Sequence, residues 1–383
     1  MALHFSKEEF SKRKKDVLIS MKEQNLDALL MFRQESMYWL TGYDTFGYVF
    51  FQSLVLDQKG NVILLTRAPD LRQAQNTSNI EDIRIWVDKD GINPTDDLKQ
   101  ILNELDLKGG NIGVEYEAYG MTGRNALRLN KSLDNYCKVE DQSELITKLR
   151  VIKSNEELVY VRKAAELADK ALDEAWKHSK AGANEAKILA EMQKAVLEGG
   201  GDYPANEYII GSGSNALLCR YQAEKRNLSE KDQLSLEWAG TYKHYHSAMF
   251  RTIPIGKADP KHIKMHEACV EALNNCVNNL VPGKTAGDVF DTHAKTFDDL
   301  GFNKARMNAC GYSLGSTFSP NWMDWPMLYT GNPYIITPGN VFFMHMILMD
   351  SDNNLAMNLG ETYLVTENGN ERLGKQKLDL VVL

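Results

Sequence analysis

The chain has 383 residues, of which 43% are hydrophobic and 25% are charged, and its formal net charge is -8. This is an ordinary globular composition, and the length predicts more than one domain because single cores stop growing at roughly 250–300 residues. The negative charge argues against a nucleic acid or an anionic membrane as the partner, since either would favour a basic face.

The sequence also bears on the compartment. No apolar run approaches the roughly 18 residues of a membrane span. The N-terminal stretch MALHFSKEEFSKRKK lacks the apolar core of a signal peptide. The five cysteines are an odd number without a CxxC pair, which predicts buried free thiols rather than disulfides or a zinc knuckle. We therefore expect a cytoplasmic protein.

The first half of the chain has the mixed pattern of an α/β domain. An amphipathic helix is predicted over residues 6–24, with Ser6 and Glu9 in the positions of a capping box. Short apolar runs predict strands, with a second helix among them. The predicted strands are 26–32, 50–57, 61–66 and 111–115, and the second helix is 93–107. These segments predict a small mixed sheet with helices that ends near Asp141.

The second half begins with two long helix-like runs and then mixes strands with helices. Ser154 and Glu157 form a capping-box pattern for a helix that extends to about residue 179. The remaining predicted helices are 184–200, 261–280 and 285–300, and the predicted strands are 206–215, 233–240, 244–256, 340–349 and 360–368.

Ionisable side chains gather in LSLEWAGTYKHYHSAMFRT, residues 234–252. Glu237, His244 and His246 lie close together there on two strand-like runs. Carboxylate and imidazole groups in such an arrangement are typical of a metal site or of an acid/base site. The surrounding motifs help to distinguish these two possibilities.

The order of motifs along the chain resembles that of the pita-bread hydrolases, which include methionine aminopeptidase, prolidase, creatinase and ectoine hydrolase. The motifs are LRVIKSNEEL, GSGSN, LSLEWAG, YHSAMFRT, LVPGKTAGDVF, GYSLG, ITPGNVFFMHMIL and ETYLVTENG. The resemblance implies an α+β fold, with an N-terminal α/β ribonuclease-H-like domain of the creatinase type over residues 1–145. A C-terminal pita-bread domain would occupy residues 146–383.

The resemblance also implies a homodimer in which the N-terminal domain of one subunit closes the site of the other. The aromatic stretch GYDTFGYVFF in the first half suits such a lid. Tyr48 in this stretch is the residue expected to reach across and bind substrate.

Peptidases of this family bind two metal ions with two Asp, one His and two Glu. By resemblance, these positions fall on Glu237, Ala248, Tyr312, His345 and Gly360. Alanine and glycine have no donor side chain and tyrosine is an uncommon ligand, so we expect no metal and no other cofactor. One weakly bound metal on Glu237, His345 and Glu361 stays open, although a one-residue slip would turn Glu361 to the opposite face.

The pattern is closer to the branch of the family that does not cleave peptides. EWAG, HYHSAMFR and GYSLG resemble segments of ectoine hydrolase, and creatinase also has Ala at the position of Ala248. Arg220 is a departure, because these relatives have a His there, so the substrate need not be ectoine. In ectoine-like and creatine-like compounds the attacked carbon belongs to a cation, which a dinuclear metal centre would repel and a carboxylate would attract.

We therefore predict a metal-independent hydrolase of a non-peptide C–N bond in a small zwitterion that carries an amidinium or a guanidinium. Two alternatives stay open: a metal-dependent Xaa-Pro dipeptidase, and a catalytically inactive pita-bread protein that binds a ligand. The expected partners are the small-molecule substrate and a second copy of the chain, with no nucleic acid and no membrane.

The catalytic roles follow from strand alternation, because every second residue of a strand points the same way. If Ala248 faces the site, His246 and His244 do so as well, while Glu237 and His345 face it from other strands. Glu237 is the predicted base or nucleophile, and His345 and His246 are the predicted proton carriers.

Four further residues are predicted to bind the substrate along with Tyr48. Arg220 pairs with the substrate carboxylate, and Tyr312 or Glu361 orients its cation. His244 is also expected to contact the substrate, although YKHYH equally fits a turn. Each role has a structural alternative, which is a buried ion pair for the charged groups, a hydrogen-bonded core position for a histidine, and simple packing for the tyrosine.

Overall fold

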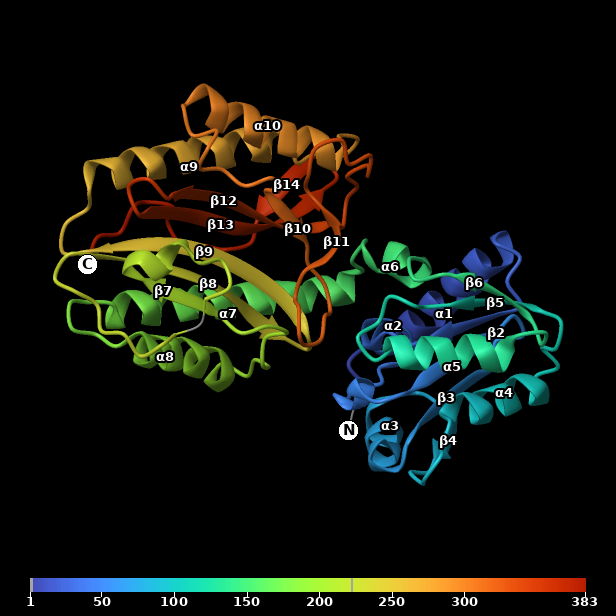
Figure 1. Ribbon diagram of the computed structural model, residues 1–383. Coiled ribbons are helices and arrows are strands. Elements are labelled where there is room, and N and C mark those ends of the chain that lie inside the picture. The colour runs from blue at the N-terminus through green and yellow to red at the C-terminus, as the bar shows by residue number, and fades with distance from the viewer. Residues whose placement is uncertain (1–2, 222) are drawn as a thin grey trace. The chain divides into compact units, whose positions relative to one another are not determined.

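The computed structural model describes residues 3–221 and 223–383. The chain divides into two compact units, of which the first ends at Arg150 and the second runs from Val151 to Leu383 (Figure 1). The predicted boundary between residues 145 and 146 falls at the start of α6 (Leu145–Arg150), a helix that belongs to the first unit. No helix among the described residues is long and apolar enough to cross a membrane.

The first unit is built on a six-stranded mixed sheet with the strand order β4-β3-β2-β1-β5-β6. The strands are β1 (Ala28–Met31), β2 (Ser53–Asp57), β3 (Val62–Arg67), β4 (Asp82–Trp86), β5 (Asn111–Val114) and β6 (Lys138–Asp141). The remaining elements are α1 (Lys7–Glu23), α2 (Gln34–Thr41), η1 (Gly47–Val49), η2 (Ala68–Asp70), α3 (Leu71–Thr77), α4 (Pro94–Glu104), α5 (Gly123–Leu133) and α6. The predicted strands and both predicted helices of this half are therefore confirmed.

This sheet is buried on both faces. In β1, Ala28 and Leu30 pack into one hydrophobic cluster, while Leu29 and Met31 pack into a second. Successive strand residues point to opposite faces, so a strand buried on both sides has to be apolar throughout. This explains why ALLM is a continuous apolar run instead of an alternating one.

The second unit contains an eight-stranded sheet in which β11-β10-β12-β13-β9-β8-β7 follow one another and β14 pairs with β13. The strands are β7 (Ile209–Ser212), β8 (Asp232–Tyr242), β9 (Tyr245–Ile255), β10 (Gly311–Ser313), β11 (Asp324–Met327), β12 (Val341–Asp350), β13 (Leu355–Thr366) and β14 (Gly369–Arg372). The helices are α7 (Asn155–His178), α8 (Glu185–Glu198), α9 (Pro260–Asn279) and α10 (Ala286–Asp299), with the short η3 (Gly213–Leu217). In Figure 1, α7 lies beside β8 and β9 with α8 packed against α7, and α9 lies beside β12 and β13 with α10 packed against α9.

Local capping fixes where the long helices begin. Ser6 Oγ accepts a hydrogen bond from the Glu9 amide at the start of α1. At α7 the full capping box forms, with Ser154 and Glu157 each satisfying a backbone N–H of the other. Both predicted N-termini are confirmed.

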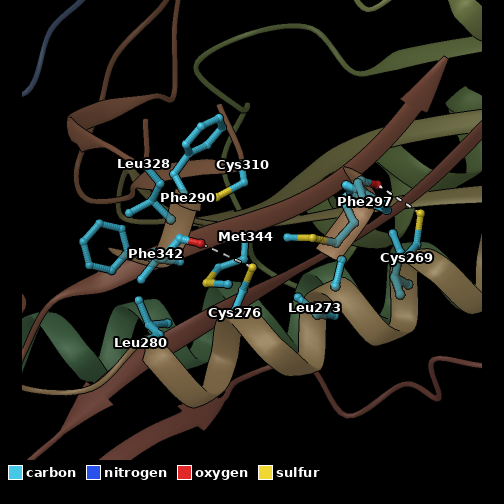
Figure 2. Close-up of a cluster of buried hydrophobic side chains, with 14 of the residues drawn as sticks. Cys269, Leu273, Cys276, Leu280, Phe290, Phe297, Cys310, Leu328, Phe342 and Met344 are labelled. Atoms are coloured by element: carbon cyan, nitrogen blue, oxygen red, sulfur yellow. Dashed lines mark hydrogen bonds between the residues drawn. The ribbon is translucent and has the colours of Figure 1, made fainter. Parts of the chain in front are cut away.

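The helices cover one face of the second sheet. Trp238 of β8 donates its indole N–H to the Ala168 carbonyl of α7. In β12, Met344 and Met346 pack into the cluster beneath α9 and α10 that Figure 2 shows. Strand alternation then places Glu237 and His345, their sequence neighbours, on the opposite face.

The five cysteines are free thiols. Cys269 and Cys276 of α9 and Cys310, just before β10, are fully buried in the same cluster (Figure 2). Cys137 and Cys219 are only partly buried, so the expectation that all five are buried is wrong for these two.

Candidate active site

Four strands place one residue each in a row across the second sheet. Glu237 of β8 pairs with Phe250 of β9, Phe250 with Gly360 of β13, and Gly360 with His345 of β12. Directly paired residues share a face, and this row lies on the face away from the helices. The structure therefore brings Glu237 and His345 to the same face, with an apolar stretch between them.

Glu237 is poorly solvated. Only 9% of its surface is exposed, and burial raises the pKa of its carboxyl to about 7. The hydrogen bond from Tyr312 and the charge of Arg220 act in the opposite direction, because both favour the ionised form. A carboxyl with a pKa near neutrality can both take up and release a proton under physiological conditions, as a general acid/base must.

A chain of hydrogen bonds orients this carboxyl. Trp322 Nε1 donates to the Tyr312 hydroxyl over 2.8 Å, and Tyr312 donates to Glu237 Oε1 over 3.3 Å. The indole is only a donor, so the Tyr312 hydrogen remains available for Glu237. Burial and the charge of Glu237 raise the pKa of Tyr312 well above its usual value, so the phenol stays protonated.

His345 faces Tyr312 with 5.7 Å between the ring centroids. It is 8% exposed, and burial lowers the pKa of its imidazole to about 4. The ring is therefore neutral at physiological pH, with one N–H and one lone pair. Among the described residues, Nδ1 of His345 has no hydrogen-bond partner.

The side chains on this face do not fit a dinuclear metal centre. Of the five aligned positions, Ala248 and Gly360 have no donor. A Cβ atom on Gly360 would lie 2.7 Å from Phe343 Cε2 and 2.9 Å from Phe250 Cβ, so the two phenylalanines fill the space of a ligand side chain. Two metal ions need a larger oxygen- and nitrogen-rich cage than the remaining side chains supply.

A possible metal-binding group lies elsewhere in the second unit. Among the described residues, the group of three metal-capable side chains is Glu174, His178 and Glu191, on α7 and α8. All three are partly exposed, and they do not belong to the row that contains Glu237.

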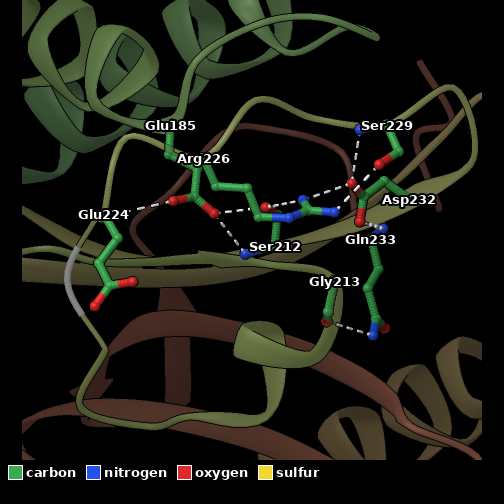
Figure 3. Close-up of polar contacts among 8 residues, drawn as sticks. All are labelled: Glu185, Ser212, Gly213, Glu224, Arg226, Ser229, Asp232 and Gln233. Atoms are coloured by element: carbon green, nitrogen blue, oxygen red, sulfur yellow. Dashed lines mark hydrogen bonds and ion pairs between the residues drawn. The ribbon is translucent and has the colours of Figure 1, made fainter.

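Arg220 lies in a segment that is anchored at both ends. Glu185 accepts hydrogen bonds from the amides of Ser212 and Glu224, and Arg226 pairs with Asp232 over 2.6 Å (Figure 3). These contacts hold the two ends of the connection between β7 and β8 close together.

Within that connection, Arg220 is exposed, and its positive charge favours the ionised form of Glu237. Among the residues that the structure describes, it has no ion-pair partner within 4 Å. A guanidinium in this position is available to an anionic group of a ligand.

His246 is a hydrogen-bonded core histidine. It is fully buried, its Nε2 accepts from the Ala205 amide over 2.9 Å, and its Nδ1 lies 3.1 Å from Thr317 Oγ1. Burial lowers the pKa of the ring to about 3. With both nitrogens engaged, His246 has none left to exchange a proton with a substrate, which favours the structural alternative over the predicted catalytic role.

The structure does not bring Glu361 to this face. It follows Gly360 directly and therefore points to the helix-covered side of β13, where it pairs with Arg251. Arg251 also donates to the carbonyls of Phe250 and Gly360, both over 2.9 Å. This pair braces β9 against β13 beneath the site, so Glu361 supports the row instead of touching a ligand in it.

His244 also lies away from the row. It forms the two-residue turn between β8 and β9 together with Lys243, with φ angles of 63° and 51°. The strand alternation behind the prediction ends at Tyr245, and the His244 ring stacks on Phe318 at 4.2 Å. Five residues of β8 separate Glu237 from the turn, about 17 Å at the usual rise of a strand, which is beyond a small substrate.

Tyr48 lies in η1 of the first unit and is 7% exposed. Its contact with a substrate across a dimer stays a prediction. Trp322 is a site residue that the sequence analysis missed. A buried tryptophan requires an acceptor, but only the fold reveals that the acceptor is Tyr312.

Comparisons with known proteins agree on the family. The description "Metallopeptidase family M24" matches residues 159–367, and "Creatinase/Prolidase N-terminal domain" matches residues 13–152. An ectoine hydrolase from Halomonas elongata is 26% identical over 390 aligned positions, which cover 97% of each chain. A Xaa-Pro dipeptidase from Pyrococcus horikoshii is 24% identical, over 96% of this chain and 98% of that one.

Solved structures have the same architecture. A dipeptidase from Pyrococcus horikoshii OT3 superposes with a TM-score of 0.85 at 23% identity, over 97% of this chain and 100% of that one. A prolidase from Thermococcus sibiricus superposes with a TM-score of 0.87 at 20% identity, over 98% and 99% of the two chains. The predicted two-domain fold, creatinase-type and then pita-bread, is confirmed.

Proposed function

The chain belongs to metallopeptidase family M24, with a creatinase/prolidase N-terminal domain, and from this premise we propose that it hydrolyses a C–N bond in a small zwitterion without a metal ion. The substrate carries a carboxylate and an amidinium or a guanidinium, as ectoine-like and creatine-like compounds do. The observation that carries the proposal is that Glu237, with a pKa raised to about 7, shares a face with the neutral imidazole of His345. Similarity to a relative named ectoine hydrolase supports the substrate class.

Binding of the cation activates the carboxyl. A positive charge next to Glu237 favours the ionised form and lowers the pKa of the group. The neighbours Phe250 and Gly360 are apolar, so solvent screens this attraction only weakly. The substrate therefore generates the base that is needed to attack it.

The reaction then needs a nucleophile and a proton carrier. Ionised Glu237 either takes a proton from water, whose oxygen adds to the cationic carbon, or attacks that carbon itself. In the first route a C–O bond forms, and the C–N bond breaks as the leaving nitrogen takes a proton. The products are an amine and an amide or urea; when the amidine is part of a ring, the amine and the amide are on the same ring-opened molecule. In the second route, water releases the product from Glu237 afterwards.

The remaining residues position the substrate. His345 is neutral and has a free ring nitrogen, so it transfers the proton to the leaving group. Arg220 binds the carboxylate through two parallel N–H donors. Tyr312 stays protonated and holds the Glu237 carboxylate in a fixed orientation.

A second candidate is a metal-dependent Xaa-Pro dipeptidase. It is favoured by the similarity to a Xaa-Pro dipeptidase over 96% of the chain. It is disfavoured by Ala248 and Gly360, which offer no ligand at two of the five positions. The two candidates differ in their need for metal and in their substrate.

The test compares both substrate classes on the purified protein. A cyclic amidine carboxylate, a guanidino acid and a Xaa-Pro dipeptide are each incubated with EDTA and, separately, with added Mn²⁺ or Co²⁺. Formation of a free amino group or of urea from a zwitterion in EDTA supports the proposal, as does elemental analysis without stoichiometric metal. Dipeptide cleavage that requires added metal would overturn it. Binding of a zwitterion in calorimetry without turnover would identify a catalytically inactive binding protein.

A further inference from the structure

A second row, with three polar members and one isoleucine, lies beside the row that contains Glu237 and His345. Ser235 of β8 pairs with Thr252 of β9, and Asn358 of β13 pairs with Ile347 of β12. Each of these residues is two positions from a member of the first row. All four therefore share its face.

The hydrogen bonds of this row are incomplete. The side-chain Nδ2 of Asn358 donates to Ser235 Oγ over 3.0 Å and to Thr252 Oγ1 over 3.1 Å. The backbone N–H of Asn358 also donates to Thr252 Oγ1. Asn358 is 1% exposed, yet its Oδ1 has no hydrogen-bond partner among the described residues. Buried carbonyl oxygens are nearly always paired, so an unpartnered one next to a candidate site calls for a ligand.

The position suits a small molecule. Asn358 is the diagonal neighbour of His345, and such residues lie about 7–8 Å apart in antiparallel sheets. His345 and Ile347 are buried but each keep 8% of their surface exposed, whereas their neighbours Met344, Met346 and Leu348 keep none, so solvent reaches β12 at this point only on this face. A compound held between Glu237 and His345 therefore lies within reach of the side-chain amide of Asn358.

We propose that Asn358 Oδ1 accepts a hydrogen bond from an N–H of the substrate cation and thereby selects amidinium or guanidinium groups with a free N–H next to the attacked carbon. This inference rests on the proposed function. Oδ1 is only an acceptor, so it discriminates against a nitrogen without hydrogen, such as a fully alkylated amidine nitrogen or the tertiary amide nitrogen of a prolyl bond. Ser235 and Thr252 fix the amide so that Oδ1 points to the ligand.

The test uses two substrates that differ only in whether the amidine nitrogens carry hydrogen. A cyclic amidine acid, which has one hydrogen on each ring nitrogen, is compared with its N,N′-dimethyl analogue, in the wild-type protein and in Asn358→Leu. Leucine has a similar size but no acceptor. For the N–H substrate we expect kcat/KM to fall about 10- to 100-fold, mainly through KM. For the dimethyl analogue the same substitution should change kcat/KM less than threefold.

Asn340→Leu is the matched control for general destabilisation. Asn340 is also a buried asparagine, hydrogen-bonded to Tyr334 and Thr337, but it lies just before β12 and away from the row. This variant should lower the melting temperature and keep the ratio of kcat/KM values for the two substrates.

Three results would overturn the inference. If Asn358→Leu lowers kcat/KM equally for both substrates, the residue is structural. If its effect disappears with an analogue that lacks the carboxylate, then Nδ2 faces the ligand in place of Oδ1. If the wild-type protein turns over no amidine or guanidine at all, the proposed function itself fails and the inference fails with it. The first two results leave the proposed function intact.

Discussion

Replacing Glu237 with glutamine removes a buried charge while keeping an acceptor for the Tyr312 hydroxyl. Glutamine is neither a base nor a nucleophile at neutral pH, so turnover should be abolished. The same change should stabilise the folded chain at high pH. Its effect on stability should have a defined pH dependence, because only the wild-type side chain titrates.

The magnitude follows from the pKa of the carboxyl, which is about 7 in the folded chain against a usual value of 4.5. As pH rises from 4.5 to 7, the unfolded chain releases this proton before the folded chain does, so the folded state loses stability. At 1.36 kcal/mol per pH unit, the loss amounts to about 3 kcal/mol. This loss of stability is absent below pH 4.5 and complete above pH 7. It does not occur in Glu237→Gln, because glutamine does not titrate.

The assay is thermal unfolding of the wild-type protein and of Glu237→Gln between pH 4.5 and pH 8, followed by tryptophan fluorescence. The two proteins should melt at similar temperatures at pH 4.5. At pH 8 the variant should melt roughly 6–12 °C higher, since each 1 kcal/mol of unfolding free energy shifts the melting temperature of a domain of this size by about 2–4 °C. Other titrating groups are common to both proteins and cancel in the difference.

Glu361→Gln is the matched control, because it makes the same chemical change on the other face of the sheet. Glu361 is paired with Arg251, so removal of its charge leaves a buried guanidinium without its anion. Such losses cost about 3–5 kcal/mol, and this variant should therefore melt below the wild-type protein. Equal effects of the two substitutions at pH 8, or turnover by Glu237→Gln, would refute the reasoning.

Four other outcomes are expected. Arg220→Lys should raise the substrate Kd about 10- to 100-fold with a smaller effect on kcat, and unchanged binding in calorimetry would make Arg220 structural. Tyr312→Phe removes a hydrogen bond that lowers the Glu237 pKa, so the acidic limb of the pH–kcat/KM profile should move to higher pH. His246→Phe should lower the melting temperature by several degrees because the Ala205 amide and Thr317 lose their partner, and lost kcat with unchanged melting would restore a catalytic role. Light scattering should show a dimer at micromolar concentration, and a monomer alone would contradict the lid assigned to Tyr48.

Much of the fold is determined by short-range sequence patterns. The Ser6 cap fixes where α1 begins and the capping box of Ser154 and Glu157 fixes where α7 begins, while continuous apolar runs reveal the buried strands. Edge strands β4 and β6 escaped prediction because DIRIW and KVED include charged residues that edge positions tolerate. The common face of Glu237 and His345 could be inferred because it depends only on the two-residue period of strands and on the motifs that align them.

The remaining features of the site depend on which strands become neighbours. Arg251 and Glu361 lie 110 positions apart in the chain, and Asn358 meets Ser235 across 123, so no local pattern connects them. Whether Nε2 of His246 is free to exchange a proton depends on the backbone N–H of Ala205 in a loop. The orientation of the Tyr312 hydroxyl depends on Trp322. Sequence alone indicated that Glu237 and His345 share a face, but it also assigned His244 and Glu361 to the site, where the fold does not place them. Tertiary pairing decided which of them keep an unsatisfied atom for a substrate, because a hydrogen bond depends on angles and distances that only the folded chain sets.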